Sequence, residues 1–74
     1  MIEKIRSCIA SLLDVEEGEI RESSQVSDFE RWDSFAHLQI IMVIEENFSV
    51  KFTTEEVISI KSVQGLMNCI KEHL

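Results

Sequence analysis

The chain has 74 residues, with 14 acidic against seven basic side chains, a net charge of −7 and 45% hydrophobic residues. A chain of this size buries about 60% of the surface that it exposes when unfolded, which leaves no room for a deep active site beside a core. The negative charge disfavours nucleic acid and anionic membranes as partners and favours proteins with basic patches.

The first predicted element is a helix over Ile2–Leu13. Its apolar residues recur at steps of three and four, which is the spacing of one buried helix face. They are Ile2, Ile5, Ile9 and Leu12. The chain contains no proline and only two glycines, so we expect helices joined by loops rather than a turn-rich β fold.

A polar segment of about twenty residues, 14–33, follows this helix. Clusters of Glu, Ser and Asp are typical of loops and helix caps. Spaced apolar side chains predict that the loop is pinned to the core rather than free. They are Val15, Ile20, Val26 and Phe29, with Trp32 as a further anchor. A loop of this length suggests a functional role.

The second predicted helix begins at Asp33-Ser34 and ends near Phe48. Asp33 is a suitable N-cap, because its carboxylate can accept the free N–H groups of the first turn. We expect an inward stripe of Leu38, Ile41, Ile44 and Phe48. An outward stripe on the opposite side consists of Phe35, Gln39, Met42 and Glu46. Met42 is equally well explained as the edge of the core.

Two more helices complete the prediction. Thr53 and Glu56 form a capping-box pattern that starts a short helix over Thr54–Ile60. The last helix begins near Ser62 and carries an inward stripe of Val63, Leu66, Met67, Ile70 and Leu74. The predicted fold is all-α: a four-helix bundle with a long first loop and a short third helix, forming a single domain over residues 1–74.

The two cysteines, Cys8 and Cys69, do not form a CxxC pair, so neither a zinc site nor a redox motif is predicted. We expect both to be reduced, apolar thiols. The N-terminus makes a poor signal peptide, and no apolar run approaches the roughly 20 residues of a membrane span. These features predict a cytoplasmic protein.

Asp33-Ser34-Phe35 is the most informative segment for function. A helix N-terminus presents unpaired N–H groups and a partial positive charge, which would hold a phosphate ester on Ser34 favourably. The simpler interpretation is that Asp-Ser is only a helix cap. His37 lies nearby, but we expect it to be packed against the core rather than to act as a base.

The segment WDSFAHLQIIMVIEENFSVKF resembles the D-S-L motif and following helix of phosphopantetheine-binding acyl carrier proteins, and TTEEVISIKSVQGLMNCI extends the match. This resemblance implies that Ser34 carries a 4′-phosphopantetheine arm, transferred from coenzyme A by a phosphopantetheinyl transferase. The arm would hold an acyl group as a thioester, and the chain itself would be no enzyme.

The resemblance also implies a partner face around Ser34. The partners would be enzymes that load or transfer the acyl group and that carry basic docking patches. The carrier itself would be a monomer. The expected recognition residues are Asp33, Phe35, Gln39, Met42, Glu45 and Glu46.

The motif also departs from the common fatty-acid pattern. Arg31-Trp32 stand where many fatty-acid carriers have glycine and a small residue, and Phe35 replaces leucine. This W-D-S variant looks more like free-standing carriers of specialised pathways, such as polyketide or aminoacyl routes. Two alternatives remain: an aminoacyl or peptidyl carrier, and an acidic helical interaction module that carries no prosthetic group.

Overall fold

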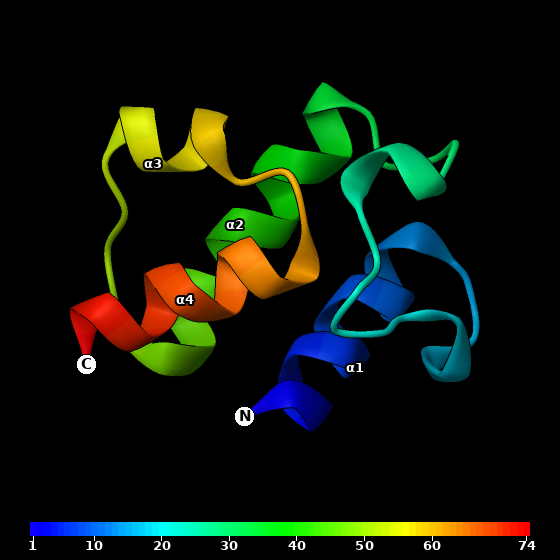
Figure 1. The fold of residues 1–74 in the computed structure, drawn as a ribbon, viewed down its shortest axis with the longest axis horizontal. Coiled ribbons are helices and arrows are strands. Elements are labelled where there is room, and N and C mark those ends of the chain that lie inside the picture. Colours follow the sequence, from blue (N-terminus) through cyan, green and yellow to red (C-terminus); the bar gives the residue numbers. More distant parts are fainter.

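A computed structural model describes residues 1–74 and contains four α-helices and no sheet. Helices α1 (Ile2–Leu13), α2 (Ser34–Phe48) and α4 (Val63–His73) surround the centre, and the short α3 (Thr54–Ser59) lies across one end (Figure 1). The predicted four-helix fold is confirmed. Only the end of α3 differs, because Ile60 is already extended.

The helix ends follow from the local sequence. Asp33, Thr53 and Ser62 each accept a hydrogen bond from a backbone N–H three residues later. These bonds cap α2 and α3 as predicted, and Ser62 caps α4 in the same way. Helices α1 and α2 end at Asp14 and Ser49, which adopt left-handed conformations with φ of 57° and 54°.

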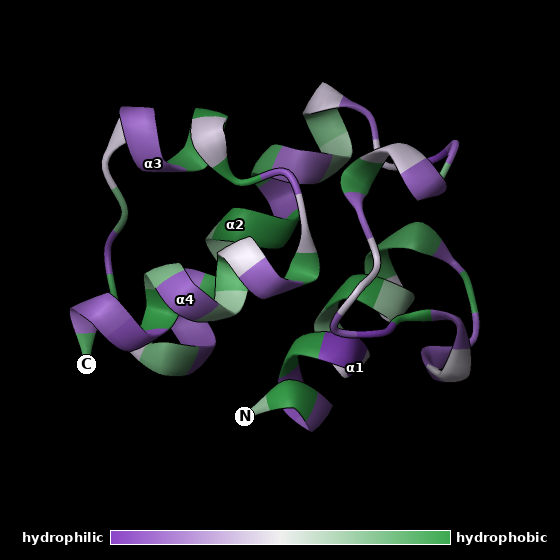
Figure 2. Ribbon diagram, in the orientation of Figure 1, coloured by the Kyte–Doolittle hydropathy of each residue, from purple (hydrophilic) through white to green (hydrophobic).

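The core lies where the apolar faces of α1, α2 and α4 meet (Figure 2). The largest side chains that are fully buried there are Ile5, Ile9, Leu13, Ile20, Ile40, Ile44, Val63, Leu66 and Ile70. Most of them belong to the periodic stripes that identified the helices. No helix combines the length and the continuous apolarity that crossing a membrane requires.

Two leucines expected in the core are exposed instead. Leu38 is 54% exposed, because the buried face of α2 is turned toward Ala36 and Ile40. Leu74 is 74% exposed, because it follows the last helical residue and has no neighbouring element to cover it. The predicted inward stripes of α2 and α4 were therefore wrong at these two positions.

The long first loop is fixed to the rest of the molecule. Ile20 and Trp32 are buried, and two short 3-10 turns, Glu17–Glu19 and Val26–Asp28, give the loop regular structure. An isolated antiparallel bridge joins the loop to the α3–α4 connection. In it, Val26 N–H donates to the Lys61 carbonyl at 2.9 Å and Val63 N–H donates to the Ser24 carbonyl at 3.0 Å.

Cys8 and Cys69 are both free thiols, half-buried and buried respectively. Burial raises the pKa of each, so both stay protonated at neutral pH. We expect a reductant to leave the thermal unfolding midpoint unchanged in a calorimetric scan. A fall in the midpoint on reduction would contradict this prediction, since it would require a stabilising bridge between the two cysteines.

Candidate functional site

Ser34 is the first residue of α2, and its side chain is exposed. The Asp33 carboxylate accepts a 2.8 Å hydrogen bond from the Ala36 backbone N–H and so caps the helix. The cap is thus made by the residue before Ser34, which leaves the serine hydroxyl on the surface. Other N–H groups of the first turn stay available to a negative group on that hydroxyl.

A chain of hydrogen bonds fixes the surroundings of Ser34. Trp32 Nε1 donates to His37 Nδ1 at 2.9 Å, and His37 Nε2 lies 2.9 Å from the Val57 carbonyl oxygen. Because a carbonyl can only accept, Nε2 must carry the proton and Nδ1 must be the acceptor. The neutral imidazole therefore links the loop, α2 and α3. Both nitrogens of His37 are engaged, so it is packed, as predicted.

A groove of about 500 Å³ opens beside Ser34 between α2 and α3. Asp33 and His37 line it together with Ser34, and Lys61 supplies the one cationic side chain. Its apolar lining consists of Val26, Trp32, Leu38, Val57, Ile58 and Ile60. The exposed Leu38 therefore belongs to this groove and not to the core.

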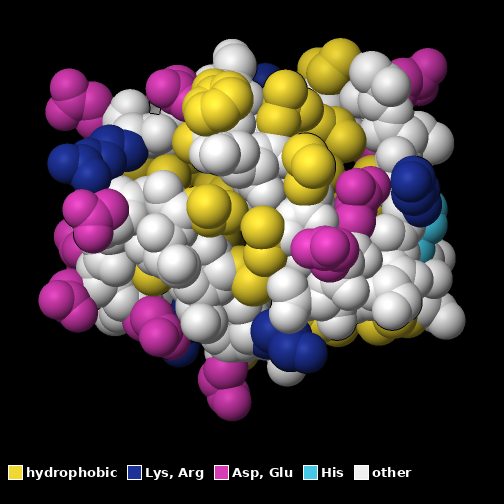
Figure 3. Space-filling model, turned by 180° about the vertical axis from the view of Figure 1, so that it is seen from behind, with side chains coloured by type: hydrophobic (Ala, Val, Ile, Leu, Met, Phe, Trp, Pro, Cys, Tyr) yellow, Lys and Arg dark blue, Asp and Glu magenta, His cyan; other side chains and the backbone are white.

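A second hollow of about 700 Å³ lies on the outward face of α2. It brings together five of the predicted recognition residues, Phe35, Gln39, Met42, Glu45 and Glu46. Phe35 and Met42 are 71% and 66% exposed, so both lie outside the core. The back view shows hydrophobic side chains gathered across this side of the molecule, with acidic side chains close to them (Figure 3).

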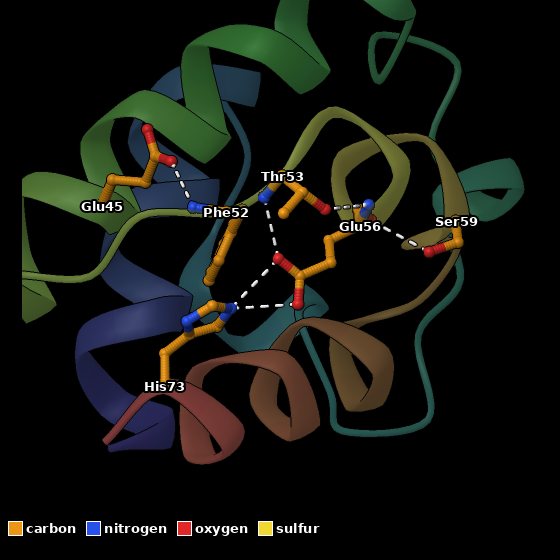
Figure 4. Close-up of polar contacts among 6 residues, drawn as sticks. All are labelled: Glu45, Phe52, Thr53, Glu56, Ser59 and His73. Carbon is orange, nitrogen blue, oxygen red and sulfur yellow. Dashed lines mark hydrogen bonds and ion pairs between the residues drawn. The ribbon is translucent and has the colours of Figure 1, made fainter.

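Two of the predicted recognition residues differ from the rest. Asp33 lies in the groove beside Ser34 and not in the second hollow. Glu45 is half-buried, and its carboxylate accepts a 2.8 Å hydrogen bond from the Phe52 backbone N–H (Figure 4). Glu45 therefore has a structural role in holding the segment after α2, whereas Glu46 is free on the surface.

A third group of polar side chains was not predicted from the sequence. Glu56 on α3 meets Cys69 and His73 on α4, with one potential ligand atom of each within 4.8 Å of the others. The sequence did contain a signal for part of this group, since Cys69 and His73 are four residues apart and share one helix face. The Thr53 backbone N–H, followed by the His73 imidazole, lowers the pKa of Glu56 to about 2.

Comparison with known proteins gives consistent matches. A family model described as "Phosphopantetheine attachment site" matches residues 3–70. An acyl carrier protein of Clostridium acetobutylicum is 33% identical over 99% of this chain and 95% of its own length. A non-reducing polyketide synthase of Monascus ruber is 30% identical over 96% of this chain, which corresponds to 3% of that enzyme.

The fold is also found among solved structures. The solution structure of a holo acyl carrier protein from Geobacter metallireducens superimposes with a TM-score of 0.84. The match covers 97% of this chain and 83% of the other, at 19% identity. At this identity the likeness shows a shared fold.

Proposed function

The chain belongs to the phosphopantetheine-binding family of acyl carrier proteins, and we propose that Ser34 is the residue to which the arm is attached. Carriers of this family hold a 4′-phosphopantetheine group covalently and present acyl groups to modifying and acyl-handling enzymes. The carrier is not itself catalytic.

The observation that carries the proposal is the difference between Ser34 and Ser62, which both stand at helix starts. Ser62 is half-buried, and its hydroxyl accepts a 3.0 Å hydrogen bond from the Gly65 backbone N–H. In α2 that capping role belongs to Asp33, so the Ser34 hydroxyl is exposed and available for modification.

The modification is a transfer from coenzyme A, catalysed by a phosphopantetheinyl transferase. The Ser34 oxygen forms a bond to the phosphorus nearest the pantetheine. The pyrophosphate bond of coenzyme A breaks, and the nucleotide half leaves while the hydroxyl proton passes to the transferase. The product is a phosphodiester at the first turn of α2, where the backbone N–H groups and helix dipole favour its negative charge.

The test is intact-mass measurement of the full chain after incubation with coenzyme A and a broad-specificity transferase. We expect the mass to rise by one phosphopantetheine group, and peptide sequencing to locate the group on Ser34. Modification of any other serine would contradict the assignment. A chain that no transferase modifies would favour the alternative of an acidic interaction module.

We propose further that the carrier acts as a single domain in the cytoplasm, in a specialised pathway. Trp32 supports the specialised pathway, because its buried indole and its hydrogen bond to His37 give the start of α2 contacts that a small residue could not make. The acyl carrier and polyketide synthase relatives are compatible with an acyl cargo. An aminoacyl or peptidyl cargo remains the alternative.

The partner face is proposed to be the hollow lined by Phe35, Met42 and Glu46. Changing Glu46→Lys should slow loading of an acyl group by a partner enzyme at low salt, because exposed charges act mainly on the encounter rate. Stopped-flow transfer rates across a salt series would measure the effect.

The control for Glu46→Lys is Glu22→Lys, which makes the same change of charge on an exposed residue outside both grooves. We expect Glu22→Lys to react nearly as fast as the unaltered chain. Equal slowing by both substitutions would mean that only the total charge matters, and it would remove this face as the docking site.

A further inference from the structure

Three side chains of different chemistry converge where α3 begins and α4 ends, at Glu56, Cys69 and His73. His73 Nε2 lies 2.9 and 3.0 Å from the two Glu56 carboxylate oxygens (Figure 4). The Cys69 sulfur completes the group, with all three potential ligand atoms within 4.8 Å of one another. None of these residues lines the groove beside Ser34 or the hollow on α2.

From this geometry we propose that Glu56, Cys69 and His73 form a zinc-binding site, with water in the fourth position. Zinc binds thiolate sulfur, imidazole nitrogen and carboxylate oxygen at about 2.0–2.3 Å in a tetrahedron. Such bonds place the ligand atoms roughly 3.3–3.8 Å apart, which lies inside the observed 4.8 Å spread. Small side-chain rotations are enough to admit the ion.

The surroundings favour a built site over a chance surface contact. Cys69 is only 7% exposed, and the side chains of Glu56 and His73 are 28% and 30% exposed. The Thr53 backbone N–H donates to Glu56 Oε1 at 2.8 Å, which orients the carboxylate as outer-shell hydrogen bonds do in metal sites. The centroids of the Phe52 and His73 rings lie 5.5 Å apart, so Phe52 limits the rotation of the imidazole.

Zinc would replace the contacts that these groups make with one another in the metal-free chain. The hydrogen bond between His73 and Glu56 is exchanged for two bonds to the ion. Burial, with a smaller contribution from Glu56, raises the pKa of Cys69 to about 11, so its thiol must release a proton as it binds. The oxygen, nitrogen and sulfur set excludes magnesium and calcium, which prefer oxygen ligands alone.

The ion would join α3 to the end of α4. Helix α3 has only six residues and is too short to be stable by itself. It also carries Val57 and Ile58, which form one wall of the groove beside Ser34. Zinc bound to Glu56, the residue directly before Val57, would therefore anchor that wall of the groove to α4.

Cobalt(II) provides the direct probe, because a thiolate ligand gives it an intense charge-transfer band. The full chain would be titrated with cobalt before its arm is attached, so that the thiol of the arm is absent. We expect the band in the unaltered chain and in Cys8→Ser, and we expect zinc but not magnesium to abolish it. Cys69→Ser should show no band, with the helical circular dichroism signal unchanged.

Calorimetric titration with zinc tests the other two ligands. Glu56→Gln and His73→Gln should each weaken zinc binding by about tenfold or more. No cobalt band in the folded, unaltered chain would overturn the proposal, as would a band that survives Cys69→Ser or disappears in Cys8→Ser. None of these measurements uses a transferase, so the result is independent of whether Ser34 carries the arm.

Discussion

Replacement of Ser34 by alanine should abolish the mass increase that coenzyme A and a transferase produce in the unaltered chain. The reason is chemical, since alanine has no hydroxyl to form the phosphodiester. The fold should be retained, because Asp33 still caps α2 and a change at an exposed position costs about 0.5 kcal/mol or less. Intact-mass spectrometry and circular dichroism together measure both expectations.

The matched control is Ser62→Ala, at the N-cap of α4. This variant should still gain one full arm, although loss of its cap bond to Gly65 should lower stability by about 1 kcal/mol. Ser34→Ala is therefore expected to abolish labelling with little effect on stability, and Ser62→Ala to lower stability with no effect on labelling. Labelling of Ser34→Ala at an unchanged level would disprove the assignment of the attachment site.

Truncation of Leu66 to alanine should strongly destabilise the fold. Leu66 is fully buried on α4, and removing such a side chain costs about 2–5 kcal/mol through lost burial and the cavity that remains. A domain of 74 residues has a total stability of only about 4–11 kcal/mol, so this loss is a large fraction of the whole. Urea unfolding followed by circular dichroism would measure the loss.

Leu38→Ala is the matched control, because it removes the same atoms from a side chain that is 54% exposed. We expect its free energy of unfolding to change by about 0.5 kcal/mol or less. A loss as large as that of Leu66→Ala would mean that Leu38 is in the core after all, as the helical spacing had predicted.

The sequence predicted the helices well because capping residues mark their starts. Asp33, Thr53 and Ser62 are local signals that do not depend on the rest of the fold. The buried face of α2 was harder to predict, because this helix carries apolar residues on nearly all sides. A helical wheel cannot decide whether Leu38 or Ile40 is buried when both faces are apolar. Only the positions of α1 and α4 determine which face of α2 is buried.

The residues of the candidate site could be predicted only where they lie on one helix. Phe35 and Met42 lie on one helix, so helical spacing alone places them together. The bond between His37 and Val57, and the contact of Glu56 with His73, join residues that are 20 and 17 positions apart. Such pairs depend on how α3 packs against its neighbours, which no local pattern contains.

The bridge between the first loop and the α3–α4 connection has a consequence for the folding kinetics. Its two hydrogen bonds join Ser24 and Val26 to Val63 and Lys61, so forming them closes a segment of about half the chain. The helices form from local contacts, whereas this closure must wait until they have docked. We therefore infer that the contact between the first loop and the α3–α4 connection is among the last parts of the fold to form, after the α2 helix that begins at Ser34.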